Sequence, residues 1–185
     1  MEDLLSALTL LAGTSSIDIL DMEDYLSGVN LEAGTSNIDQ KWGLFIYRTT
    51  YDDQALWERY LAYVKAAIMR AIEPQPEPNP QISWDLYFDK IFRRTILRSR
   101  FELLTKDDEE NLKSKSILEL REEFRRWAAT IPSEEKTGMN KPKYNHFLYV
   151  NKEILNWFQK VETARGDREP DYLHEDMIAV IVKVD

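Results

Sequence analysis

The chain has 185 residues, of which 43% are hydrophobic and 11% aromatic, enough to fill the core of one ordinary domain. It contains no cysteine, which excludes disulfides, thiolate metal sites and a cysteine nucleophile. The formal net charge is -9, and no apolar run approaches the roughly 20 residues that span a bilayer. We therefore expect an intracellular protein, located in the cytoplasm, with no contact to a membrane.

Negative charge gathers at one end of the sequence, because residues 1–40 contain carboxylates and no Lys or Arg. The carboxylates of this acidic arm are Glu2, Asp3, Asp18, Asp21, Glu23, Asp24, Glu32 and Asp39. Residues 41–185 are nearly neutral and predict a single α+β domain, whereas the arm predicts short helices or disorder. An arm of one sign is typical of a segment that meets something basic, in a partner or in the same molecule.

A seven-residue motif occurs twice in the arm. Residues 12–18 (AGTSSID) recur as residues 33–39 (AGTSNID). Two copies are too few for a solenoid, which needs at least three stacked units. Two interpretations stay open. In one, Gly ends a helix and Thr-Ser starts the next element, and in the other the copies are short linear motifs offered to a partner.

The first elements of the domain have clear signals. Residues 42–48 are aromatic and β-branched without a helical period, and they predict a central strand buried on both faces. Asp52 or Asp53 then caps a helix that ends near Glu73. Prolines alternate with polar residues over 74–80, which predicts a stiff loop.

Periodicity, capping residues and β-branched runs predict the remaining elements. They are a basic helix at 84–97, a strand at 101–105, a solvated acidic turn at 107–110, a helix from the Ser116–Glu119 capping box to Pro132, a polar loop at 136–142, a strand at 144–150, a helix capped by Asn151 and closed by 164–167, and a strand at 177–184. Helices separate nearly all strands. We expect an α+β fold with a three- to four-stranded, mostly antiparallel sheet and helices packed on one face, an elaborated ferredoxin-like sandwich.

Four short stretches form a pattern that is similar to one in another set of proteins. They are YRTTY at 47–51, WER at 57–59, FRRW at 124–127 and FLYV at 147–150. In this pattern the chain resembles a broad set of uncharacterised proteins from filamentous (ascomycete) fungi. The resemblance covers about residues 42 to 184, departs from the pattern at 74–100, and leaves the acidic arm outside. It implies an intracellular fungal protein and no known activity.

Residues that could carry chemistry are few. His146 lies in a predicted strand and His174 precedes the last one, without the spacing of a metal site. No glycine-rich phosphate loop occurs, and the turn at 107–110 lacks the alternating ligands and the glycine of a calcium loop. We expect no metal and no cofactor.

A candidate anion-binding group lies at the end of the first predicted strand and directly precedes a helix. It consists of Arg48, Thr49, Thr50 and Tyr51. Backbone N–H groups, the positive end of the helix dipole and an Arg side chain would suit a phosphate or a carboxylate there. In the alternative interpretation, Arg48 pairs with an acidic neighbour, and the threonines and Asp52 cap the helix.

The first functional hypothesis is a non-catalytic interaction or regulatory protein that contacts a protein partner through the arm or the basic segment 84–100. Its candidate contact residues are Asp18, Asp21, Glu23, Asp24, Asp39, Arg93, Arg94 and Arg98. The arm could also fold back and mask the arginines of its own body, and a homodimer is a further option.

Two other hypotheses come from different classes. One is a cofactor-free enzyme or small-molecule binder with a cavity between sheet and helices, in which Tyr47, Arg48, His146 and Tyr149 would transfer protons. The other is an RNA binder that uses its aromatic strands for stacking. The sequence pI near 4.9 opposes RNA binding, so we expect no nucleic-acid partner.

Overall fold

The computed structural model describes residues 19–20, 41–72, 95, 97–136, 141–166 and 180–184. Its strands are β1 (Ile19–Leu20), β2 (Trp42–Arg48), β3 (Phe101–Lys106), β4 (His146–Val150) and β5 (Val180–Lys183). Its helices are α3 (Gln54–Ala71), α5 (Glu109–Leu112), α6 (Ile117–Ala129), the 3-10 helix η2 (Ser133–Lys136), α7 (Lys141–Asn145) and α8 (Lys152–Arg165). Within these ranges, every helix falls short of the length and apolar character needed to cross a membrane.

The fold is α+β, and its open sheet has the strand order β1-β5-β4-β2-β3. Strand β2 is parallel to both of its neighbours, β3 and β4, whereas β5 is antiparallel to β4 and to β1. The sheet is therefore mixed, so the prediction of a mostly antiparallel sheet was wrong, and a ferredoxin-like arrangement is not confirmed. The apolar run of β2 was a sequence signal for parallel pairing, and in the structure every residue of this strand is buried. Continuous apolar strands of this kind are typical of parallel pairing with helical crossovers.

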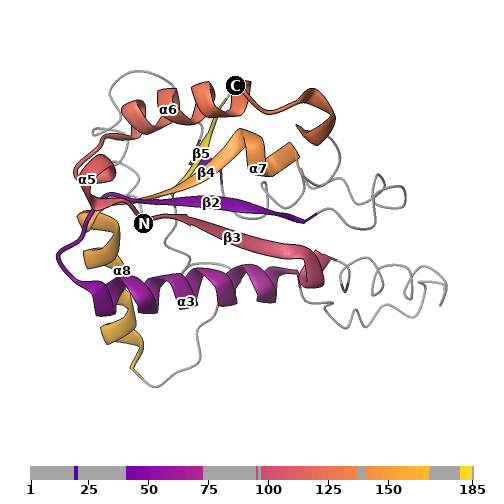
Figure 1. Cartoon of the computed structure of the whole chain (residues 1–185). Coiled ribbons are helices and arrows are strands. Elements are labelled where there is room, and N and C mark those ends of the chain that lie inside the picture. Colours follow the sequence, from indigo (N-terminus) through magenta and orange to yellow (C-terminus); the bar gives the residue numbers. More distant parts are fainter. Residues whose placement is uncertain are drawn as a thin grey trace, which may run out of the picture.

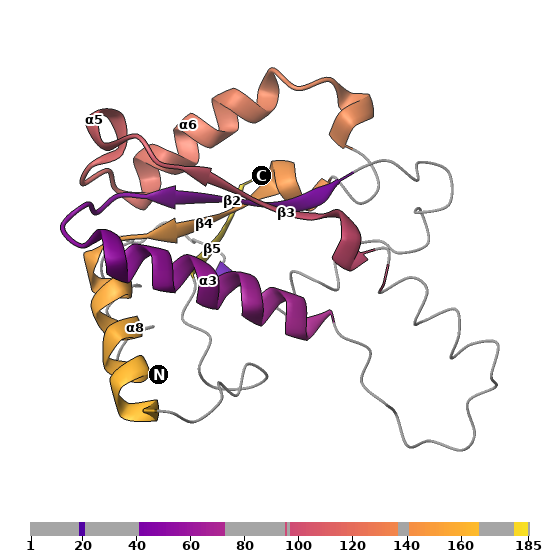
Figure 2. The same ribbon diagram turned by 60° about the horizontal axis from the view of Figure 1, so that its bottom comes forward.

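Helices cover both faces of the sheet. Figure 1 shows α3 and α8 on one face and α6 on the other, and the turned view in Figure 2 separates the same layers. The prediction of helices on one face was wrong for a topological reason. The chain passes from β2 through α3 to β3 on one side, and then through α6 to β4 on the other side of β2. Right-handed crossovers in opposite directions place their helices on opposite faces.

Side chains of β2 alternate between the two layers. Phe45 and Tyr47 contact the Phe124 ring of α6, with ring centres 6.0 Å and 6.4 Å away. Arg48 contacts Trp57 of α3 on the opposite face. The core thus consists of two apolar layers, one on each side of the sheet.

Local capping signals set several helix ends as predicted. The Asp53 carboxylate accepts the Leu56 N–H at 2.8 Å and caps α3. Asn151 caps α8, and Ser116 with Glu119 forms the capping box of α6. These caps work from neighbouring residues alone, which explains why they could be predicted.

Two segments differ from the prediction. Residues 144 and 145, expected in a strand, end α7. The acidic turn leads into α5, because the Asp108 carboxylate accepts the Asn111 N–H at 3.2 Å and caps that short helix. The loop at 74–80 and residues 177–179 lie outside the described residues. Of the helix expected at 84–97, Thr95 and Leu97 are described, and both are helical.

Candidate functional site

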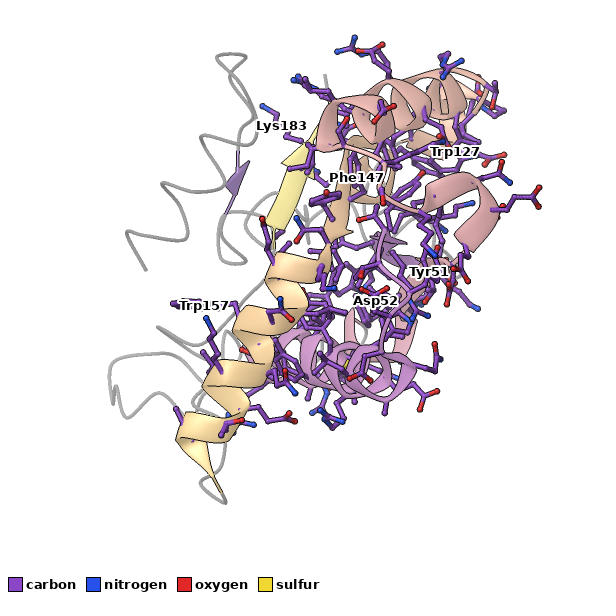
Figure 3. The ribbon with its side chains drawn as sticks, turned by 90° about the vertical axis from the view of Figure 1, so that its left-hand side faces the viewer. Tyr51, Asp52, Trp127, Phe147, Trp157 and Lys183 are labelled. Atoms are coloured by element: carbon purple, nitrogen blue, oxygen red, sulfur yellow. The ribbon has the colours of Figure 1, made fainter. Side chains whose placement is uncertain are left out.

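The parallel strands β2 and β3 have their carboxyl ends along the same edge of the sheet, and Arg48 and Asp107 meet at these ends. From there β2 continues into α3 on one face, and β3 continues toward α6 on the other. Ligands of open α/β sheets bind where two such connections diverge. Figure 3 looks onto this edge and labels Tyr51 and Asp52 of the β2–α3 connection. The predicted anion site therefore lies at a position that many folds use for ligands.

Arg48 is almost fully buried, with 3% of its surface exposed, and groups of the protein itself hold its guanidinium. Its Nε donates to the Thr50 carbonyl at 2.8 Å. Its Nη1 donates to Gln54 Oε1 at 2.7 Å and to Asp107 Oδ2 at 3.3 Å. These contacts tie the end of β2 to the start of α3 and to the loop after β3.

Two aromatic rings enclose the same guanidinium. Its central carbon lies 4.5 Å from the ring centre of Tyr51 and 5.1 Å from that of Trp57. The Tyr51 hydroxyl donates to the Arg48 carbonyl at 3.0 Å. Burial and the nearby Asp107 carboxylate raise the pKa of Tyr51 to about 12, because both disfavour the phenolate. Tyr51 is thus a neutral hydrogen-bond donor that holds this loop against Arg48.

The remaining polar groups of the connection also have partners within the protein. Thr49 Oγ1 donates to the Val150 carbonyl at 3.0 Å. The Asp52 carboxylate pairs with Lys152 Nζ at 2.7 Å, and this contact lowers the pKa of Asp52. The pair of Arg48 with Asp107 agrees with the alternative interpretation, but its expected helix cap was wrong, because Asp53 caps α3 and the threonines and Asp52 do not. An anion that entered this edge would have to displace the carboxylate of Asp107.

The four residues considered for proton transfer are not brought together. Tyr47 and Tyr149 are partners in the parallel register and lie on the face of α6. Arg48 lies on the face of α3, and His146 alternates onto that face at the other end of β4. Burial raises the pKa of Tyr149, which makes its hydroxyl a poorer proton donor.

Aromatic rings fill the interface between the sheet and α6, where a ligand cavity was considered. Their ring centres lie 4.7 Å to 6.0 Å apart, and the rings are those of Phe45, Phe124, Trp127 and Phe147. Such edge and tilted contacts are typical of a close-packed core. Over the described part of the chain, no group of three or more His, Cys, Asp or Glu residues could hold a metal ion.

The buried Tyr47 gives a testable pH dependence. Burial and the charge of Glu123 raise its pKa to about 12, from an ordinary value of 10.0. Between these values the folded state keeps a proton that the unfolded state loses. The stability linked to this group is therefore complete below pH 10 and is lost as the pH rises toward 12. We expect Tyr47→Phe to flatten the alkaline decline in urea unfolding between about pH 9 and about pH 11. An unchanged slope would contradict the assignment.

One part of the acidic arm contacts the body. Strand β1 pairs with β5, with Ile19 opposite Val182 and Leu20 opposite Ile181. All the predicted contact residues of the arm lie outside the described residues, as do Arg93, Arg94 and His174; those of the arm are Asp18, Asp21, Glu23, Asp24 and Asp39. Arg98 is helical and exposed.

Sequence reasoning missed the partners of Arg48. Asp107 is 59 residues away in the chain, and only the parallel pairing of β2 with β3 brings the two together. A usable signal was that two predicted strands end in charged residues, Arg48 and Lys106-Asp107. Parallel pairing would have placed these ends side by side.

No protein-family model, curated protein or solved structure matches this chain. The resemblance to fungal proteins therefore stays a prediction.

Proposed function

We propose that this chain is a non-catalytic interaction protein whose acidic arm binds a basic segment of a protein partner. The observation that carries the proposal is the pairing of β1 with β5. This pairing attaches the arm to the edge of the sheet at two residues that lie between Asp18 and Asp21 in the sequence. Addition of an extended segment to a sheet edge is a common mode of protein recognition, and β1, as the outer strand on this side of the sheet, would offer that edge to a partner.

The charge of the arm supports a basic partner. Its carboxylates account for most of the net charge of -9, while residues 41–185 are close to neutral. Complementary charge speeds association and selects the partner, and its effect decreases as salt screens it. On this proposal the protein acts inside the cell as an adaptor or regulator, without a cofactor.

Neutralising the arm tests the proposal. The variant carries Asp18→Asn, Asp21→Asn, Glu23→Gln and Asp24→Asn, and the probe is a fluorescently labelled oligolysine peptide. A single charge contact at a protein surface contributes a few tenths of a kcal/mol, so we expect the four changes together to weaken binding about tenfold at low salt. Fluorescence anisotropy of the full chain at low and high ionic strength measures the effect.

A matched variant separates the arm from the overall charge. It carries glutamines at four glutamates that are exposed on the body, and these are Glu58, Glu122, Glu135 and Glu153. Its net charge changes by the same amount, and we expect its affinity to stay within about twofold of wild type. Equal losses in both variants would show that only net charge matters. Failure of the wild-type chain to bind the peptide at low salt would contradict the proposal directly.

A further inference from the structure

Edge strand β3 is only partly covered on the face of the sheet that carries α6. Lys106 lies on that face because it contacts Phe45 there, and Glu102 and Leu104 share the face by alternation. All three β3 residues are half-buried, whereas Phe45 on the neighbouring strand is 6% exposed. A half-open strip therefore runs along β3 beside the closed core.

Lys106 is the unusual residue of this strip. Its Nζ lies 5.1 Å from the ring centre of Phe45 and 5.9 Å from that of Trp127, within the range of cation–π attraction. Among the described residues, no carboxylate pairs with it. A half-buried ammonium has lost part of its hydration and is stabilised by a negative partner.

A second lysine beside the same ring behaves differently. Lys143 Nζ lies 6.0 Å from the Phe45 ring centre, and it pairs with Glu102 Oε1 at 2.6 Å. Of the two ammonium groups at Phe45, one is thus neutralised by a carboxylate, and the other has no carboxylate partner among the described residues.

The indole ring of Trp127 lies next to Lys106. Its side of the sheet is that of α6, as Figure 3 shows, and the residue is half-buried rather than closed in the core. The ring of Tyr144 lies 5.8 Å from it at an interplanar angle of 33°, and Phe45 contacts it edge-on at 4.7 Å. These contacts hold the indole in one orientation and leave part of it accessible.

We propose that Lys106 and Trp127 form a binding site for a small planar aromatic molecule that carries one anionic group. The anionic group, a carboxylate or a phosphate, pairs with Lys106 Nζ. The aromatic ring of the ligand packs on the exposed part of Trp127. This site is separate from the acidic arm and does not depend on the function proposed above.

The test uses the full chain and four probes in calorimetric titrations. Indole-3-acetate and phenyl phosphate carry a ring and an anion, whereas acetate and inorganic phosphate carry the anion alone. We expect the ring-bearing probes to bind at least about tenfold more tightly than the matching simple anion, because only they use both residues. Preference for one of the two ring-bearing probes supports the site and identifies its anionic group.

Substitutions of lysine distinguish binding at this site from a general effect of net charge. Lys106→Met is expected to weaken binding of the preferred probe by about tenfold or more, and Lys106→Arg to retain most of it. Lys41→Met is the matched control, because Lys41 is 69% exposed and contacts the same Glu102 that neutralises Lys143. Thermal melting checks that each variant is folded, and Trp127→Leu is the second variant if Lys106→Met does not fold.

Three results would overturn the proposal. They are the failure of both ring-bearing probes to bind, equal affinity for a ring-bearing probe and its simple anion, and equal losses in Lys41→Met and Lys106→Met.

Discussion

Gly43→Ala is expected to lower the free energy of unfolding by roughly 3 kcal/mol or more. A Cβ at this position would lie 1.8 Å from the carbonyl oxygen of Glu102 and 2.8 Å from its carbonyl carbon. These atoms belong to the backbone of β3, which pairs with β2 at this point in the register. Backbone cannot turn away as the tip of a side chain can, so the two parallel strands would have to separate. Urea unfolding followed by tryptophan fluorescence measures the loss.

Gly166→Ala provides the matched control for this substitution. Gly166 has φ 59 and ψ -135, a backbone conformation that costs alanine energy, but no atom of the described residues lies within 4 Å of its added Cβ. We expect it to cost only about 1 kcal/mol, from backbone strain alone. If the two alanine variants lost the same stability, the close approach of β2 and β3 would not explain the effect at position 43.

Arg48→Met is expected to cost about 2–3 kcal/mol, because it removes a buried group that several elements share. The variant loses the hydrogen bonds to the Thr50 carbonyl and to Gln54, and the contact of the guanidinium with Trp57. Methionine keeps much of the apolar volume, so the loss reports mainly on the polar contacts. Urea unfolding at neutral pH measures the effect.

Asp107→Asn tests how much of this stability comes from the ion pair and how much from the enclosed guanidinium of Arg48. The Asp107 side chain is 38% exposed and lies 3.3 Å from Nη1, so water screens the pair. We expect this variant to cost less than about 1 kcal/mol. Losses of similar size in Asp107→Asn and Arg48→Met would mean that the ion pair, rather than the enclosed guanidinium, stabilises this edge.

Elements whose determinants are local could be predicted from the sequence. The capping box of Ser116 and Glu119 and the cap at Asn151 depend on residues three positions apart. Strand β2 was predicted from its apolar run, and β3 from its composition and its place before an acidic turn. In each case one short stretch contains the information.

Strand order, direction and the partners of Arg48 could not be predicted in the same way. They depend on contacts between segments far apart in the chain, such as the pairing of Phe45 with both Leu104 and Phe147. A run such as 42–48 fits the centre of several sheets, and pairwise register decides among them. The contact between Asp107 and Arg48 in the candidate site could not be predicted either, because it forms only when β3 pairs with β2.

The parallel pairing of β2 also affects how the protein is made. Thr49, directly after β2, bonds to Val150 at the end of β4 across 101 residues of sequence. At ribosomal rates of roughly 5–20 residues per second, the neighbour of β2 on that side follows on the order of ten seconds later. During this interval a strand that is buried along its whole length lacks its pairing with β4. Chaperone protection of nascent chains should therefore matter most between the synthesis of β2 and that of β4.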